Sequence, residues 1–162
     1  MGENYKTVFE VSLFSNGELK ESVLFLSVGI AVAIIGIFAK WYKRPARIQN
    51  KIAIWSWLAI FIPFSSIWLI YNIEHSQELT LALTTGRCET VEGLVTVLHE
   101  QSSQGHGPGD LIQIAGKEFT INYWTTTLGY KQTVSHGGEL QNGVFARLHY
   151  VGDEIIKVEI KQ

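Results

Sequence analysis

Two long uncharged runs of apolar residues occupy the first half of the chain, and shorter alternating runs follow in the second half. The apolar runs cover residues 23–39 and 52–71, and Trp41 and Tyr42 extend the first helix to residue 42. A helix of about 20 apolar residues crosses the roughly 30 Å core of a bilayer, and both runs approach that length. The pattern therefore predicts two transmembrane helices, residues 23–42 and 52–71, that form an antiparallel hairpin.

A basic loop between the two runs predicts their orientation. It has five basic and no acidic side chains, at Lys40, Lys43, Arg44, Arg47 and Lys51. Short loops rich in lysine and arginine stay in the cytoplasm. We therefore expect a multi-pass protein of the cytoplasmic (inner) membrane, with residues 43–51 inside and both residues 1–22 and the chain after residue 71 outside. The five basic side chains are expected to contact anionic lipid headgroups.

Small residues recur along both predicted helices. They are Gly29, Ala33 and Gly36 in the first helix, and Ser56, Ala59 and Ser66 in the second. Small residues at helical spacing let backbones approach closely in lipid. We expect these residues to pack the hairpin, with a seam between copies in an oligomer as the alternative. Because neither run contains a charged residue, we do not expect transport through these helices alone.

Alternating patterns predict strands on either side of the helices. Residues 7–14 alternate and predict a short strand or an interfacial segment, and residues 72–86 extend the second helix as far as Gly86. Five further strands are predicted at residues 88–99, 111–114, 117–124, 144–150 and 154–160, within a domain of residues 87–162. The expected fold is an α+β membrane protein, a two-helix transmembrane hairpin followed by a small, mostly antiparallel five-stranded β domain.

Closure of these five strands into a small OB-like or SH3-like barrel would remove exposed sheet edges. An open two-layer sheet is the alternative. The composition adds a constraint on partners, because residues 72–162 carry six basic and eleven acidic side chains. A nucleic-acid partner would need a clustered basic surface, so we expect membrane lipids and an envelope protein or a second copy as partners, and no nucleic acid.

Two glycine-containing loops interrupt the strands, at residues 101–109 and 125–143. Long loops between strands often carry function, so we expect these two to form the contact surface. The candidate partner-binding residues within them are Tyr130, His136 and His106. Gly137 and Gly138 beside His136 are expected to supply turns with positive φ.

The side chains that could carry chemistry follow no known pattern. His99, His106, His136 and His149 match no zinc spacing, and no cofactor or metal is expected. Ser135 and His136 are sequence neighbours and lack the glycine-flanked serine of hydrolases. The single Cys88 cannot form an internal disulfide. It is either a small buried apolar residue or the site of an intermolecular disulfide between two copies.

The second half of the chain resembles a domain of small, uncharacterised bacterial envelope proteins. The resemblance lies in residues 88–93 (CETVEG), 135–138 (SHGG) and 143–150 (GVFARLHY). It implies an envelope location and an OB-like β domain. It implies no activity and carries over no catalytic residues.

Three classes of function follow from these expectations. The first is a membrane-anchored extracytoplasmic binding or scaffold module, non-enzymatic, that contacts a protein or ligand through the loops at 101–109 and 125–143. The second is an oligomeric membrane assembly or pore subunit built from the small-residue stripes. The third is a metal-dependent envelope enzyme, which would use the histidines.

Overall fold

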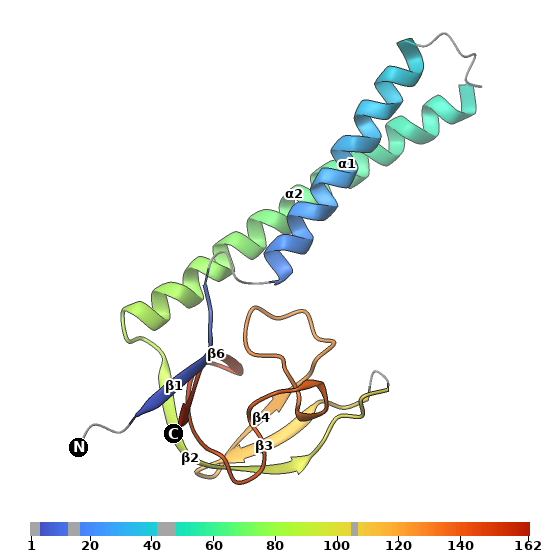
Figure 1. Cartoon of the computed structure of the whole chain (residues 1–162). Coiled ribbons are helices and arrows are strands. Elements are labelled where there is room, and N and C mark those ends of the chain that lie inside the picture. Colours follow the sequence, from blue (N-terminus) through green and yellow to red (C-terminus); the bar gives the residue numbers. More distant parts are fainter. Residues whose placement is uncertain (1–3, 13–16, 42–47, 105–106) are drawn as a thin grey trace. The chain divides into compact units, whose positions relative to one another are not determined.

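The computed structural model describes residues 4–12, 17–41, 48–104 and 107–162 (Figure 1). The chain divides into two compact units. One, called here the helical unit, covers residues 16–75. The other, called the sheet unit, combines residues 1–15 with residues 76–162, so that the boundary falls within the second helix, between His75 and Ser76.

The helical unit contains α1 (Gly17–Trp41) and most of α2 (Ile48–Thr84). Gly29 is buried against Phe61, and a Cβ added at Gly29 would lie only 2.7 Å from that aromatic ring. Farther along, the buried Asn72 side chain donates a 3.4 Å hydrogen bond to the hydroxyl of Ser22. Close approach at Gly29 and the hydrogen bond from Asn72 to Ser22 are therefore two of the contacts between α1 and α2.

The prediction of a two-helix transmembrane hairpin is corrected by the structure. Within the described ranges, one helical segment, Leu58–Thr84, is long and apolar enough to cross a membrane, with a hydropathy of 1.2. This candidate segment lies in α2, which continues past residue 71 through Glu74 and Glu78 to Thr84, as the sequence pattern predicted. The multi-pass arrangement is therefore not supported, and α2 supplies the candidate span.

The residues predicted to pack the helices have different surroundings. Gly29 is buried, Ala33, Gly36 and Ser66 are half-buried, and Ser56 and Ala59 are exposed. The predicted headgroup contacts cannot be placed. Lys43, Arg44 and Arg47 lie outside the described residues, and so do the side chains of Lys40 and Lys51.

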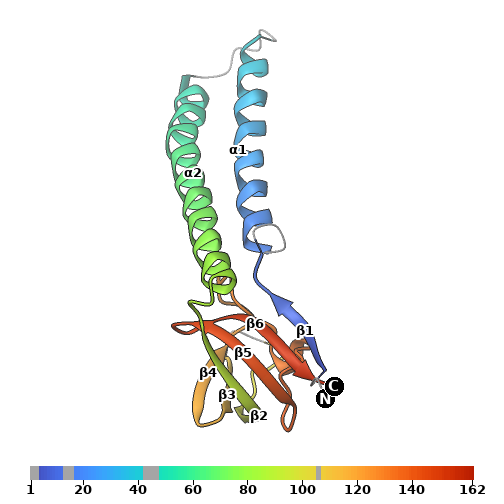
Figure 2. The ribbon, with the colours of Figure 1, turned by 90° about the vertical axis from the view of Figure 1, so that its left-hand side faces the viewer.

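The sheet unit holds one antiparallel sheet in the order β1-β6-β5-β2-β3-β4 (Figure 2). Its strands are β1 (Tyr5–Glu10), β2 (Glu89–His99), β3 (Asp110–Ile114), β4 (Lys117–Ile121), β5 (Phe145–Val151) and β6 (Glu154–Lys161). The predicted five-stranded β domain is therefore corrected to a mixed α+β fold with a six-stranded sheet. The described strands run in an open order from β1 to β4, instead of closing into an OB-like or SH3-like barrel.

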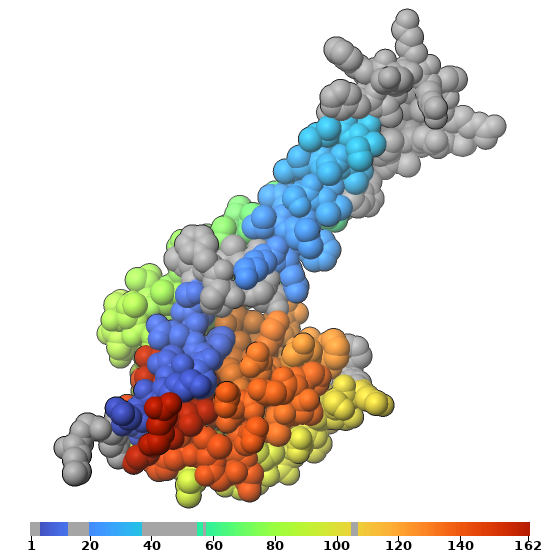
Figure 3. All heavy atoms as spheres, in the orientation of Figure 1, coloured from blue at the N-terminus to red at the C-terminus, as the bar shows by residue number. Residues whose placement is uncertain are grey.

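The additional strand is β1, which pairs with β6 from Tyr5 opposite Lys161 to Glu10 opposite Lys157. In the space-filling view its blue atoms lie against the red atoms of the final strand (Figure 3). The register shifts between Thr7 and Phe9, so strict alternation breaks at this bulge. Without β1, the backbone groups of β6 would be left unpaired at a sheet edge.

The main core lies on one face of the curved sheet. Every second residue of β5 is buried, which places Ala146, Leu148 and Tyr150 in this core. The ring of Tyr150 meets the ring of Phe119 edge to face, with centroids 5.1 Å apart. A smaller cluster joins the last turns of α2 to the sheet through Val11, Leu79, Leu128 and Ile156. The sheet unit therefore has its own hydrophobic interior, on which its loops are mounted.

Candidate functional site

One buried carboxylate connects the two loops that the sequence pattern singled out. Asp110 begins β3, and its side chain is among the buried polar groups of the sheet unit. Its Oδ1 accepts a 2.7 Å hydrogen bond from the backbone amide of Gln101, and its Oδ2 accepts one of 2.7 Å from the amide of Val134. Because a buried carboxylate must replace its lost hydration with donors, these two bonds fix both loops to one point.

The side chain of Gln101 extends this connection toward residues 122–124. Gln101 is 1% exposed, which is unusual for a glutamine. Its Oε1 accepts a 3.1 Å hydrogen bond from the amide of Tyr123, and its Nε2 donates one of 3.0 Å to Oδ1 of Asn122. The same Asn122 oxygen accepts a 3.0 Å hydrogen bond from the amide of Trp124. The backbone that carries Tyr123 and Trp124 is thereby held in place.

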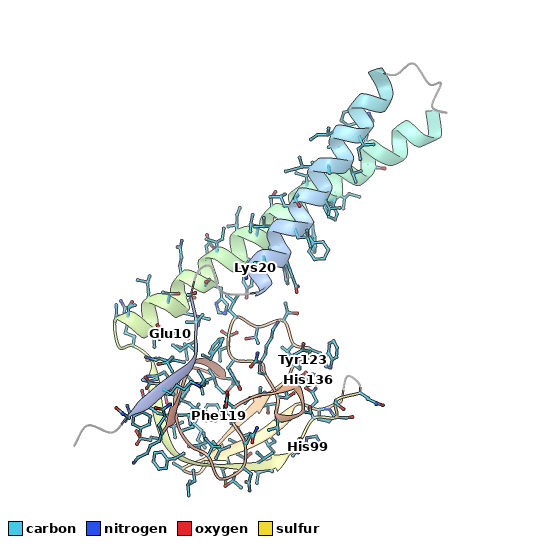
Figure 4. The ribbon with its side chains drawn as sticks, in the orientation of Figure 1. Glu10, Lys20, His99, Phe119, Tyr123 and His136 are labelled. Carbon is cyan, nitrogen blue, oxygen red and sulfur yellow. The ribbon has the colours of Figure 1, made fainter. Side chains whose placement is uncertain are left out.

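Three rings gather on this support, and we call them the aromatic cluster: Tyr123, Trp124 and His136. The rings of Tyr123 and His136 are stacked, with centroids 3.9 Å apart and an interplanar angle of 6° (Figure 4). The indole of Trp124 meets the Tyr123 ring edge to face at 5.1 Å. Tyr123 is 37% exposed and Trp124 is 48% exposed, whereas His136 is half-buried, so two of the three rings are open to solvent.

The loop around His136 is shaped to present its ring. A short 3₁₀ turn, η1 (Val134–His136), follows the buried Thr133, whose hydroxyl lies 2.7 Å from Nδ1 of His136. Gly137 has a φ of 81°, as expected for a glycine-supplied turn. Gly138 is needed for space instead, because an added Cβ would collide with the carbonyl oxygens of Gln132 and Thr133.

The other predicted contact residues have different places. Tyr130 is 6% exposed and belongs to the main core, so its assignment to the contact surface is corrected. Burial raises the pKa of its hydroxyl, whose oxygen accepts a 3.0 Å hydrogen bond from the amide of Glu139. His106 lies outside the described residues. His136 is half-buried, and its role in partner contact stays a prediction.

Tyr123 and Trp124 were not predicted as site residues, because the pattern assigned both to a strand of residues 117–124. That strand, β4, ends at Ile121. A usable signal was present in the sequence. Neighbouring strand residues point to opposite faces, so two consecutive aromatic residues at a strand end cannot both enter one core.

The histidines form no metal centre in the described part of the chain, where no group of three or more His, Cys, Asp or Glu side chains could hold an ion. His99 instead places Nδ1 3.0 Å from the carbonyl oxygen of Gly109. His149 lies on β5, away from His136 in sequence, among charged neighbours on β6.

Comparisons with models of protein families, with characterised proteins and with solved structures find no match to this chain.

Proposed function

We propose that this protein is a membrane-anchored binding module whose sheet unit contacts a protein partner through the aromatic cluster. The observation that carries the proposal is the stack of His136 on Tyr123 beside the exposed Trp124, held by the buried Asp110 and Gln101. Rings that are already fixed lose little conformational freedom when they are buried by a partner. Trp and Tyr are also the residues that most often dominate binding energy at protein interfaces.

The chemistry of the cluster defines the kind of partner. The partner surface would offer an apolar pocket for the indole of Trp124. Around that pocket it would be neutral or basic, because residues 72–162 carry eleven acidic against six basic side chains. We assign the partner to the same envelope compartment as the sheet unit.

Anchoring is assigned to α2. Large apolar side chains on its surface are exposed, at Ile60 (72%), Phe64 (67%) and Ile67 (67%). Exposed apolar surface of this extent is unfavourable in water and favourable in lipid. With the basic segment around residues 40–51 in the cytoplasm, the sheet unit would lie outside it.

The test is crosslinking from a photoreactive residue placed at position 123 of the affinity-tagged full chain, followed by binding assays with the purified partner. Trp124→Ala should weaken the complex by at least about tenfold, as for a central interface aromatic. Leu94→Ala is the matched control, because Leu94 is a 60% exposed apolar residue of β2 in the same unit.

One partner that binds wild type and Leu94→Ala equally and is lost with Trp124→Ala would support the proposal. Unchanged affinity of Trp124→Ala would refute it. Crosslinks formed only between copies of the chain would also refute a separate protein partner.

A further inference from the structure

A thiol, an imidazole and a carboxylate lie in line in the sheet unit, on three segments that are distant in sequence. Cys88 lies directly before β2, His149 on β5 and Glu159 on β6. Sγ of Cys88 is 3.9 Å from Nδ1 of His149, and Nε2 of His149 is 3.3 Å from Oε2 of Glu159. Strand pairing creates this arrangement, because β5 is the neighbour of both β2 and β6.

The carboxylate partner of His149 determines which ring nitrogen donates a hydrogen bond. Burial raises the pKa of Glu159, but hydrogen bonds from Lys157 and His149 outweigh burial and hold that pKa below its ordinary value. An ionised carboxylate only accepts hydrogen bonds, so Nε2 of His149 carries the proton. Nδ1 is then an acceptor, and its lone pair faces both the Thr90 hydroxyl at 3.1 Å and the Cys88 thiol at 3.9 Å. His149 is therefore placed to accept the thiol proton.

The thiol and the imidazole line an open pocket of about 430 Å³ in the sheet unit. Leu83 and Gly86 give the pocket an apolar part, and Glu10 and Lys157 give it one charge of each sign. Nζ of Lys157 is 3.3 Å from Oε2 of Glu10. A small molecule with both an ammonium and a carboxylate group could replace this ion pair. Its carboxylate would pair with Lys157 and its ammonium with Glu10.

We propose that Cys88 is a nucleophilic thiol that exchanges with a small zwitterionic disulfide bound in this pocket. Nδ1 of His149 takes the proton from Sγ, and the thiolate attacks one sulfur of the disulfide. The sulfur–sulfur bond breaks, and the leaving thiolate takes the proton from His149. The products are a mixed disulfide on Cys88 and one free small thiol, so no other oxidant is needed.

The mixed disulfide persists because the chain has one cysteine and hence no second thiol to release the bound group. His149 is a catalytic residue in this scheme, and Glu159 is a positioning residue. Other charged groups also face the carboxylate, with Nζ of Lys157 3.1 Å from Oε1 and an Arg147 nitrogen 3.8 Å from Oε2.

The first experiment measures the rate of Cys88 alkylation by iodoacetamide on the detergent-solubilised full chain, by intact mass, from pH 6 to 9. With a single cysteine, every adduct reports Cys88. His149→Gln should slow the reaction at pH 7 by about tenfold or more, because the thiolate loses its proton acceptor. Glu159→Gln should move the pH profile upward, an effect that a change in exposure alone would not produce. His99→Gln is the control, and its alkylation rate should match that of wild type. A His149→Gln variant that is alkylated as fast as wild type would overturn the proposal.

The second experiment requires no variant for its main result. Wild-type protein is incubated with cystine, which is zwitterionic at each end, or with the neutral hydroxyethyl disulfide, and the adduct is followed by intact mass. Cystine should react about fivefold faster or more, and Lys157→Met should reduce that ratio toward one. Equal rates with the two reagents would overturn the zwitterionic ligand. Disulfide-linked chains that form faster than the cystine adduct would overturn a small-molecule ligand in favour of a second copy.

Discussion

Arg147 on β5 donates a 2.6 Å hydrogen bond to Glu92, which lies directly opposite it on β2. The guanidinium also lies 4.0 Å from the centre of the Tyr5 ring, and the Tyr5 hydroxyl donates a 2.6 Å hydrogen bond to the other oxygen of Glu92. One carboxylate thus connects β1 to the middle of the sheet. The hydrogen bonds from Tyr5 and Arg147 hold the pKa of Glu92 below its ordinary value of 4.5.

This lowered pKa predicts a pH dependence of stability. The ionised Glu92 stabilises the fold at pH values above 4.5, and the stabilisation is lost as pH falls through the folded-state pKa. Glu92→Gln should therefore lower the thermal midpoint at pH 7, and the difference from wild type should shrink as pH falls below 4.5, as measured by circular dichroism. Glu118→Gln, at an exposed position of β4, should lower it at neither pH. A deficit of Glu92→Gln that stays constant with pH would contradict this assignment.

Asp110→Asn should destabilise the sheet unit. Both carboxylate oxygens of Asp110 accept a hydrogen bond from a backbone amide. Asn keeps one acceptor oxygen, but its NH₂ group is a donor and would face the donor N–H of the other amide. The expected loss is about 1–3 kcal/mol in the free energy of unfolding, the cost of an unsatisfied buried group. Urea titration of the full chain in detergent measures it. Asp153→Asn, at an exposed turn position, serves as the control, and equal denaturation midpoints for the two variants would show that Asp110 does not join the loops.

Substitutions at Tyr130 and Trp124 should have separate effects, one on folding stability and the other on partner binding. Tyr130→Phe removes the oxygen that accepts the Glu139 amide and should cost about 1 kcal/mol of stability without changing partner affinity. Trp124→Ala should do the reverse, because the indole is 48% exposed. Calorimetric titration and thermal melts on both variants provide the comparison. Weakened binding by a fully folded Tyr130→Phe would return that residue to the contact surface.

Two glycines near the loops should respond differently to alanine. Gly138→Ala forces a Cβ against the carbonyl of Gln132 and should cost about 1–3 kcal/mol, the usual range for overpacking. Gly107→Ala should be tolerated, because no atom of the described residues lies within 4 Å of the added Cβ. The difference is measured as the shift in urea midpoint between the two variants. A Gly138→Ala protein as stable as Gly107→Ala would mean that the turn at Gln132 relaxes freely.

The sequence pattern predicted the positions of the strands better than it predicted which strands pair. Alternation located β2 to β6 within a few residues, because side chains on a pleated strand face one core at a period of two. It could not reveal that β1 pairs with β6, since that pairing joins Tyr5 to Lys161 across nearly the whole chain. The expectation of a closed barrel was wrong because β1 covers the edge of β6. An added strand protects a sheet edge from unwanted pairing, as closure into a barrel would.

The site was predictable only in part. The two loops stood out by their glycine content, yet their connection depends on Asp110 and Gln101, which look like ordinary polar residues until their burial is known. The alignment of Cys88 with His149 depends on strand register, which places Thr90 opposite His149. No spacing along the chain encodes that proximity.

The pairing of β1 with β6 has a consequence for making the sheet unit without the helices. A shortened chain of residues 76–162 would lack β1 and expose the full edge of β6, so we expect it to aggregate. The amide of Gln162 donates a 3.0 Å hydrogen bond to the carbonyl of Asn4, so the first strand can be reconnected behind the last one. A rearranged chain in which residues 4–12 follow residue 162 through a short glycine linker would complete the sheet by itself and separate the chemistry of this unit from the membrane.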